Sequence, residues 1–448
     1  MIDTVKKDGA RPTVSAVLPD GSLVELVYRV DERRTCFCVC TTGEYRFEES
    51  LLVDGRRLVP YSPSNNLLTH EVVLFPSHPA DYDSDADLVR AIQAFIHRYV
   101  DVSPLFEQLA SYYVLLSWVY DRFNELAYLR VRGDYGSGKT RFLQVVGSLC
   151  YKPIFASGAS TVSPIFRILD AVRGTLVIDE GDFRLSDERA EVVKILNNGN
   201  ARGFPVLRSE LTGKHEYNPT AYAVFGPKLV ATRGFFQDRA LESRCLTEEM
   251  GQGRLRGDIP ITLPETFKTE ALQLRNQLLL FRFRNYLKGS AADDLVDAQV
   301  EPRLNQILLP LLSLIEEPQA RQDLRDLGRR MHRQVIADRG LEMEAQLLEI
   351  IRDLRASTPD TRLTLKEITQ WFADRYGEEY DRKVTTKWVG SILRKKLQLR
   401  PQKSHGVFVI PPSEVPKFDQ LFEKYGLGPD DGDETAGEPD ASHDTTFG

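Results

Sequence analysis

The sequence lacks the features of a membrane or secreted protein. No apolar run approaches the roughly 18 residues that a membrane-spanning helix needs, and the longest, around residues 112–120, ends at Asp121. The N-terminal segment, which includes Lys6 and Lys7, lacks the apolar centre of a signal peptide. We therefore expect a cytoplasmic protein without a membrane partner.

Cysteine is scarce, with five residues in 448, and their placement fits no disulfide framework. Cys36, Cys38 and Cys40 alternate along one segment, so in a strand their side chains would share one face. A metal site is one interpretation, but no second Cys/His cluster at zinc spacing completes it. We favour buried, reduced thiols, because free cysteine is usually buried.

Outside its C-terminal end, the chain has no excess of charge of either sign. The net charge of the whole sequence is −7, but residues 428–448 hold seven acidic residues and no Lys or Arg. The remainder holds 58 acidic and 58 basic residues. The acidic tail has little apolar surface to bury, so we expect residues 427–448 to be disordered. A nucleic-acid surface would have to come from local clusters of basic residues.

What the chain does contain is a phosphate-binding loop that fits the pattern G-x-x-x-x-G-K-[ST] at every fixed position. A strand is predicted before it, at residues 126–132, and a helix after it, at residues 141–150. Glycines at such a turn let backbone N–H groups converge on an anion, and the helix N-terminus adds its dipole. Lys139 would reach the β- and γ-phosphates of ATP, and the Thr140 hydroxyl would hold Mg²⁺. The loop consists of Gly133, Asp134, Tyr135, Gly136, Ser137, Gly138, Lys139 and Thr140.

Two carboxylates follow further along the chain, at the end of an apolar segment. Residues 176–178 are apolar and lead into Asp179 and Glu180. We expect Asp179 to bind Mg²⁺, through water, and Glu180 to polarise the attacking water as a general base. A chance loop match and an ordinary strand end are the alternatives, and the order of the two motifs argues against both.

A third strand with a polar end is predicted at residues 228–232. It ends on Thr232, 53 residues past Asp179. A hydroxyl at that position would sense the γ-phosphate or position the lytic water. The spacing leaves room for a hairpin before this strand.

At this point the chain resembles the AAA+ family of ATPases over about residues 125–315. Ser243-Arg244-Cys245 is similar to the Ser-Arg-Cys box of clamp loaders, whose arginine enters the neighbouring subunit's site. The resemblance makes Arg244 the arginine finger, with Arg239 in reserve, and implies a ring-shaped homo-oligomer, expected to be a hexamer. Arg303 resembles the sensor-2 arginine of the lid and would contact the nucleotide. Surface ion pairing is the alternative role for each arginine.

The predicted hairpin indicates which group of AAA+ proteins the chain resembles. Its turn lies at residues 211–215 and its returning strand at residues 222–225. It looks like the hairpin before the sensor strand in superfamily 3 and MCM-like replicative helicases, where a Lys or Lys-His at the tip grips single-stranded DNA in the pore. Lys214 and His215 match that tip. A solvated surface loop is the alternative.

The last folded segment, residues 341–426, is predicted to be a winged-helix domain. The predicted order of its elements is a helix, a short strand (residues 363–365), two helices and a hairpin around His405 and Gly406. Residues 382–405 hold eight basic residues and no acidic one, which favours duplex DNA in contact with the third helix and the wing. A protein-docking winged helix is the alternative. The candidate DNA contacts are Lys383, Lys387, Arg394, Lys395, Arg400 and Lys403.

These signals predict an α/β fold: an AAA+ parallel-sheet core with a helical lid, flanked by a β-rich N-terminal domain and a C-terminal winged helix. The expected domains are residues 1–62 (β-rich), 63–125 (helical lead-in), 126–262 (nucleotide-binding core), 263–340 (lid), 341–426 (winged helix) and 427–448 (tail).

The predicted function is that of an ATP-driven, Mg²⁺-dependent DNA helicase or translocase, similar to motors that replicate mobile or phage-like elements. A second hypothesis is an ATP-switched DNA-binding regulator of transposition or defence that separates no strands. A third, a small-molecule kinase, explains neither the arginine-finger segment nor the basic C-terminal domain.

Overall fold

The computed structural model describes residues 9–157, 161–179, 187–211, 217–236, 238–251, 253, 255–288, 293–340, 343–357, 362–376 and 384–428. The chain divides into two compact units, Met1–Gly328 and Arg329–Gly448. The division falls inside one continuous helix, α10 (Pro318–Gly340), whereas the sequence led us to expect a boundary after residue 340. Among the described residues, no helix combines the length and the apolar character needed to cross a bilayer.

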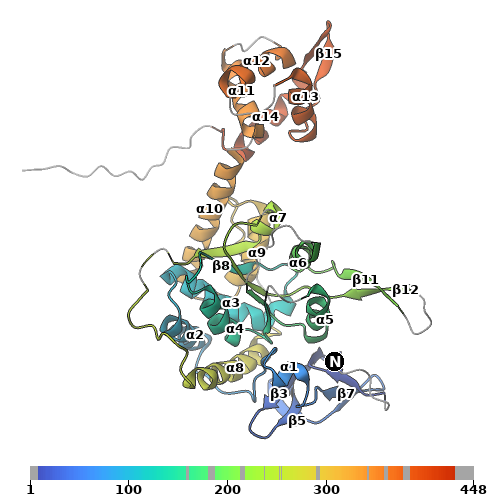
Figure 1. Cartoon of the computed structure of the whole chain (residues 1–448), viewed down its shortest axis with the longest axis vertical. Helices are drawn as coiled ribbons and strands as arrows, with labels where there is room; N and C mark the ends of the chain where they lie inside the picture. The colour runs from blue at the N-terminus through green and yellow to red at the C-terminus, as the bar shows by residue number, and fades with distance from the viewer. Residues whose placement is uncertain are drawn as a thin grey trace, which may run out of the picture. The chain divides into compact units, whose positions relative to one another are not determined.

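A parallel sheet of five strands runs through the first unit (Figure 1). All four pairings between neighbouring strands are parallel. The strands β8, β13 and β10 are buried along almost their whole length, which explains the apolar runs at residues 229–231 of β13 and 176–178 of β10. The prediction of a parallel sheet is therefore confirmed. In spatial order the strands are β14 (Cys245–Glu249), β8 (Tyr128–Arg132), β13 (Lys228–Thr232), β10 (Leu176–Asp179) and β9 (Ile154–Ser157).

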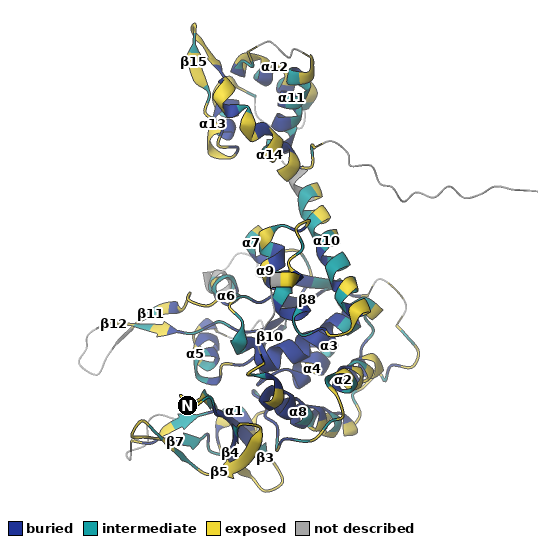
Figure 2. Ribbon diagram, turned by 180° about the vertical axis from the view of Figure 1, so that it is seen from behind, coloured by how far each residue is buried: buried dark blue, intermediate teal, exposed yellow. Residues whose placement is uncertain are grey.

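Helices cover both faces of this sheet, which is the most buried part of the unit (Figure 2). Gly147 of α4 lies against Val177, on one face. Phe166 of α5 and Ile195 of α6 cluster with Ile178, on the other, because successive side chains of a strand point to opposite faces. The helices of this unit include α1 (Asn66–Thr69), α2 (Asp85–Tyr99), α3 (Pro104–Val119), α4 (Lys139–Leu149), α5 (Val162–Val172), α6 (Asp187–Asn198), α7 (Arg239–Glu242), α8 (Thr266–Asn285) and α9 (Pro302–Leu312).

The N-terminal segment forms two small sheets. The first is antiparallel in the order β2-β3-β4-β5, and the second has the order β1-β7-β6. Cys36, Cys38 and Cys40 lie on β4 as buried free thiols, and burial raises the pKa of all three. The prediction of buried thiols is confirmed. The strands are β1 (Arg11–Thr13), β2 (Ser15–Val17), β3 (Leu23–Arg29), β4 (Arg34–Thr41), β5 (Glu44–Glu48), β6 (Leu51–Val53) and β7 (Arg56–Pro60).

A buried ionic network joins these strands to the core. Glu25 of β3 accepts hydrogen bonds from Arg282 Nε (2.7 Å) and from the Tyr151 hydroxyl (2.6 Å). The other two guanidinium nitrogens of Arg282 each lie 2.8 Å from a carboxylate oxygen of Asp121. Burial alone would lower the pKa of Arg282, but Asp121, Tyr151 and Glu25 outweigh it and raise that pKa well above its ordinary value. The charges are therefore buried but compensated.

We predict that Glu25→Ala lowers the free energy of unfolding of the first unit by about 3–5 kcal/mol, because it leaves Arg282 buried with part of its charge uncompensated. Urea unfolding followed by intrinsic fluorescence measures this. The control is Glu49→Ala, which removes an ion pair with Arg34 whose carboxylate side chain is 80% exposed and should cost less than about 1 kcal/mol. Similar small losses in both variants would show that the network does not hold the β-rich segment to the core.

The second unit is built from helices and one hairpin. Where a strand was expected at residues 363–365, the structure has a single β-bridge between Thr364 and Val409. The hairpin itself is present: its two turn residues, His405 and Gly406, have φ of 47° and 84°, as a type I′ turn requires. The elements are α11 (Met343–Ser357), α12 (Leu365–Tyr376), α13 (Thr386–Lys395), β15 (Gln402–Ser404), β16 (Val407–Val409) and α14 (Pro416–Lys424). Most of the predicted acidic tail, residues 429–448, lies outside the described residues.

Candidate active site

The loop predicted to bind phosphate connects β8 to α4, as expected from the sequence. Gly136 and Gly138 have φ of 74° and 91°, a backbone conformation that glycine adopts without strain. Gly138 also forms the N-cap of α4. Gly133 is needed for a different reason: a Cβ there would lie 2.5 Å from the Met250 carbonyl oxygen and 2.8 Å from Ser137 Oγ. The loop is thus shaped by its glycines and by the close approach of the chain after β14.

The side chains of the loop lie close to its own backbone. The Lys139 ammonium donates to the carbonyl oxygens of Gly133 (2.6 Å) and Asp134 (2.7 Å). Ser137 Oγ also donates to the Asp134 carbonyl, at 2.8 Å. Tyr135 is 78% exposed, and the Arg233 guanidinium lies 3.8 Å from the centroid of its ring. The cation of Lys139 therefore lies over the loop where phosphates would bind.

Two motifs that the sequence separates by 39 residues meet at this edge of the sheet. The Thr140 hydroxyl donates to Asp179 Oδ2 at 2.6 Å. Asp179 ends β10, and Thr140 lies in the first turn of α4. A hydroxyl and a carboxylate offer the oxygen ligands that Mg²⁺ prefers, so these residues fit the ion. Glu180, the predicted general base, lies outside the described residues.

Thr232 lies between the loop and Asp179, because β13 is placed between β8 and β10. Its carbonyl oxygen accepts the Gly133 N–H at 3.2 Å. Its hydroxyl is buried and has no hydrogen-bond partner among the described residues. An unpaired buried hydroxyl costs about 1–3 kcal/mol, so a polar group arriving at this edge would relieve it.

The segment after β13 is tied back to β8 by a buried arginine that sequence reasoning missed. Arg130, which is 1% exposed, forms an ion pair with both carboxylate oxygens of Glu242 on α7. Its Nε also donates to Thr247 Oγ1 at 3.0 Å. Burial alone would lower the pKa of Arg130, but the Glu242 hydrogen bond raises it above its ordinary value. The sequence offered one signal for this buried ion pair, an arginine flanked by apolar residues within the predicted strand.

The two arginines expected to serve the nucleotide lie together beside α7. Arg303 donates to the Ala240 carbonyl oxygen at 2.7 Å, and Arg244 donates to the Asn197 side chain. Burial and then the charge of Arg303 lower the pKa of Arg244. Within the described part of the chain, neither side chain hydrogen-bonds to the loop at residues 133–140. The reserve candidate, Arg239, is exposed on the same helix.

The hairpin before β13 is present but its second strand lies earlier than expected. β11 (Val206–Leu211) pairs antiparallel with β12 (Tyr217–Tyr222), whereas we expected the returning strand at residues 222–225. Residues after Tyr222 have other partners: the Ala223 N–H donates to Asp170 Oδ1 at 2.9 Å. Lys214 and His215 lie outside the described residues.

Helices α5 and α6 anchor the base of this hairpin, which projects from the body of the unit (Figures 1 and 2). Arg208 of β11 pairs with both carboxylate oxygens of Glu191, at 2.9 and 2.8 Å, and its guanidinium lies 5.1 Å from the Phe166 ring centroid. The Lys228 ammonium, fully buried, donates to the carbonyl oxygens of Val224 and Gly226, both at 2.9 Å. Burial lowers the pKa of Lys228 to about 7.

The described candidate DNA contacts of the second unit are solvent-exposed. On α13, Val389, Ile392 and Leu393 are buried, so the basic residues of that helix point away from the core. Lys383 lies outside the described residues. The exposed candidate contacts are Lys387, Arg394, Lys395, Arg400 and Lys403.

No protein-family model and no curated protein matches this chain. Solved structures with a similar arrangement include the apo NrS-1 C-terminal region, at 8% sequence identity and a TM-score of 0.37, covering 86% of this chain and 95% of that one. SCCmec type IV Cch, described as an active helicase, is 11% identical, with a TM-score of 0.37 and coverage of 91% and 80%. JCV helicase is 12% identical, with a TM-score of 0.25 and coverage of 58% and 62%. Likenesses at these TM-scores do not assign a family or an activity.

We predict that Asp179→Asn lowers Mg²⁺-dependent ATP hydrolysis by about 100-fold, because the amide removes the negative charge that would face the ion. Steady-state phosphate release measures the effect, and titration with a fluorescent ATP analogue without Mg²⁺ should show nearly unchanged binding. Asp81→Asn, at a carboxylate that is 95% exposed, is the matched control. Full turnover in Asp179→Asn would contradict a role for Asp179 in binding the ion.

Proposed function

We propose that the chain is a ring-forming ATPase of the AAA+ type that couples ATP hydrolysis to movement along DNA, as a helicase or translocase of a mobile or phage-like element. The observation that carries this proposal is the meeting of Thr140 and Asp179 at 2.6 Å, beside the buried Thr232 hydroxyl. A fold that only binds a phosphate does not need a carboxylate and an unpaired hydroxyl at the same edge.

In this proposal the residues of the site have separate roles. The backbone N–H groups of the loop and the Lys139 ammonium bind the phosphates of ATP. Thr140 and Asp179 hold Mg²⁺, which neutralises charge on the phosphates when it is bound. Glu180, next in sequence after Asp179, accepts a proton from the attacking water. Thr232 orients that water or contacts the γ-phosphate.

The hairpin is the part that we propose to move DNA. In the sequence the hairpin is inserted between β10 and β13. Both β10 and β13 end at the edge of the sheet that is proposed to bind the nucleotide. A shift of Asp179 can therefore reach the hairpin through α6, which follows β10, and a shift of Thr232 can reach it through β13. Lys214 and His215, at its tip in the sequence, would contact phosphates of single-stranded DNA without reading bases.

Arg244 and Arg303 support a site shared between subunits. Arg303 hydrogen-bonds to α7 and Arg244 hydrogen-bonds to Asn197 of α6, and among the described residues neither side chain hydrogen-bonds to the loop of its own chain. Burial and then the charge of Arg303 lower the pKa of Arg244, so an anion beside them would stabilise the charged form of Arg244. We propose that this anion is the ATP bound to the neighbouring subunit, in a homo-oligomeric ring that we expect to be a hexamer.

We propose that the second unit is a winged helix that binds duplex DNA. Among its exposed basic residues, the five described candidate contacts lie on α13, on the hairpin β15–β16 or between the two. A third helix in the major groove and a wing on the phosphates would use all five described residues, Lys387, Arg394, Lys395, Arg400 and Lys403.

We predict that single-stranded DNA stimulates ATP hydrolysis by the wild type, and that Lys214→Ala abolishes the stimulation but not the basal rate, because Lys214 would contact DNA and not ATP. A coupled ATPase assay with and without oligo(dT) measures both rates. Lys268→Ala is the control, since that side chain is 74% exposed and pairs with Glu71 on another surface. Undiminished stimulation in Lys214→Ala would remove the hairpin tip from the mechanism.

We predict that Arg244→Ala lowers turnover by about 10³-fold or more, as loss of an arginine finger does, while each subunit still binds ATP. Because the finger would act on the neighbour's ATP, a mixture of Arg244→Ala with Lys139→Ala subunits should recover measurable activity at mixed interfaces. Neither variant alone should show it. The absence of recovery, in rings shown to be mixed by native mass spectrometry, would place Arg244 in its own subunit's site.

A further inference from the structure

The edge of the sheet opposite the nucleotide site holds a cavity of about 310 Å³. Four of its lining residues precede the strands of the parallel sheet: Tyr120 before β8, Tyr151 before β9, Arg173 before β10 and Phe225 before β13. The cavity is also lined by β2 and by the turn that leads into β11. Its size falls in the range of small-ligand sites, about 300–1,000 Å³. It therefore lies where the sheet, the hairpin base and the N-terminal strands meet.

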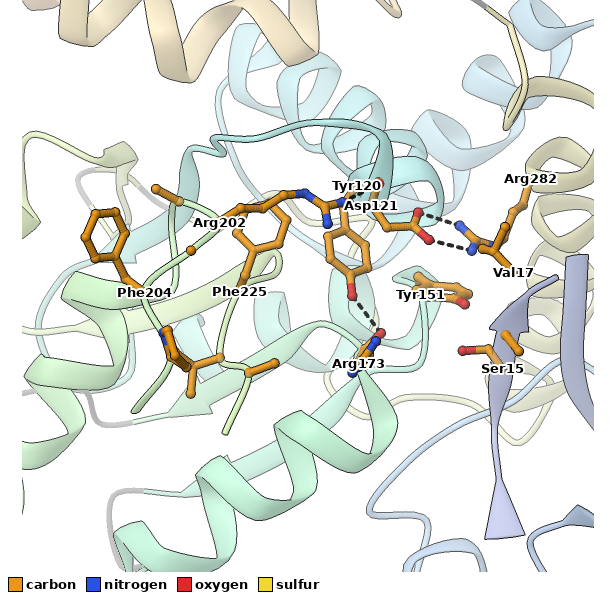
Figure 3. A pocket seen from close by; sticks show the side chains of 16 residues that line it. Ser15, Val17, Tyr120, Asp121, Tyr151, Arg173, Arg202, Phe204, Phe225 and Arg282 are labelled. Atoms are coloured by element: carbon orange, nitrogen blue, oxygen red, sulfur yellow. Dashed lines mark hydrogen bonds and ion pairs between the residues drawn. The ribbon is translucent and has the colours of Figure 1, made fainter. Parts of the chain in front are cut away.

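Rings and guanidinium groups form a continuous wall of this cavity. The Arg202 guanidinium lies 4.9 Å from the Phe225 ring centroid. The rings of Phe225 and Tyr120 are 5.7 Å apart, and those of Tyr120 and Tyr151 are 6.2 Å apart. The Tyr120 hydroxyl donates to the Arg173 carbonyl oxygen at 3.0 Å. Figure 3 shows Phe204, Phe225 and Arg202 on one side of the cavity and Ser15 and Val17 of β2 on the other.

The cavity carries an excess of positive charge. Among its arginines, Arg282 is compensated by Asp121 and Glu25. Arg202 donates to backbone carbonyl oxygens, including that of Phe123 at 2.7 Å. Neither Arg202 nor Arg173 forms an ion pair with a carboxylate among the described residues, and both are exposed. Two cationic groups therefore face an opening that is otherwise lined mainly by rings and apolar side chains.

We infer that this cavity binds one nucleotide of a DNA single strand, outside the contact made by the hairpin tip. The base would stack on Phe204, a residue that is 66% exposed, and on Phe225. Arg173 and Arg202 would bind the adjoining phosphates. Stacking on aromatic rings together with basic side chains is how proteins bind single strands without reading sequence. The inference rests on the proposed function, because the strand would arrive from the hairpin whose base lines the cavity.

A strand fits the cavity better than a free nucleoside triphosphate does. The cavity contains no loop of glycines to gather backbone N–H groups on a triphosphate, and among its described lining residues Arg173 and Arg202 are the charged groups left for an anion. Two phosphodiesters of a strand, one for each arginine, match these two positive charges. The exposed Leu207 of β11, two residues after the lining residue Pro205, continues the surface toward the hairpin.

The test is a binding and cross-linking experiment on the full chain. Fluorescence anisotropy with labelled oligo(dT), in a non-hydrolysable ATP analogue, should show affinity about fivefold weaker or more in Phe204→Ala. Arg173→Gln should weaken binding and lower the slope of log K against log[salt] by about one unit. Leu52→Ala and Arg56→Gln, at exposed positions of the N-terminal sheets, are the matched controls. Basal ATP hydrolysis should stay at the wild-type level in all four variants, because none touches the nucleotide site.

Ultraviolet cross-linking with 5-iodouracil in the same oligonucleotide should label a peptide that contains Phe204 or Phe225. Wild-type affinity in both cavity variants, with labelling elsewhere, would overturn this inference and leave the proposed function intact. Protection of these peptides by ATP or thymidine monophosphate as strong as that by the oligonucleotide would also overturn it and indicate a small-molecule pocket. If the wild type bound no single strand at all, the proposed function itself would fail.

Discussion

The hydrogen bond from Thr140 to Asp179 depends on one constraint, the parallel order of β8, β13 and β10. Strands that run in the same direction end at the same edge, so the loop after β8, the carboxylate of β10 and the hydroxyl of β13 must converge there. Close packing maintains the convergence, since a Cβ at Gly147 of α4 would lie 3.1–3.3 Å from the side chains of Phe155 and Val177, tighter than an ordinary contact. The candidate chemistry of this chain is a consequence of strand order more than of any single residue.

The same sheet gives the molecule a second edge, about 15 Å away along a five-residue strand. There the buried network of Glu25, Arg282 and Asp121 fixes the N-terminal strands, and Lys228 fixes the base of the hairpin. β13 runs from that hairpin base to Thr232. A single buried strand therefore connects the element proposed to contact DNA with the edge proposed to contact ATP, which is the connection that a motor requires.

The parts of this fold that follow from local sequence were predictable. The glycines of the loop, the strand that ends on Asp179 and the hairpin turn at His405 and Gly406 each depend on neighbours within a few residues. The parts that depend on distant partners were not. Arg282 meets Glu25 across 257 residues, and Arg303 meets α7 across 63, and no local pattern indicates either contact. The second hairpin strand was misplaced because Asp170 and Lys228, both outside the hairpin, hold residues 223–226.

We propose that ATP hydrolysis at this sheet edge performs work on DNA. The decisive experiment is ATP-dependent unwinding of a forked duplex, with Lys139→Ala as the blank. We expect strand separation by the wild type in Mg²⁺ and ATP, and none by Lys139→Ala or in a non-hydrolysable analogue. Hydrolysis that is unaffected by DNA, with no strand separated and no duplex traversed, would contradict it.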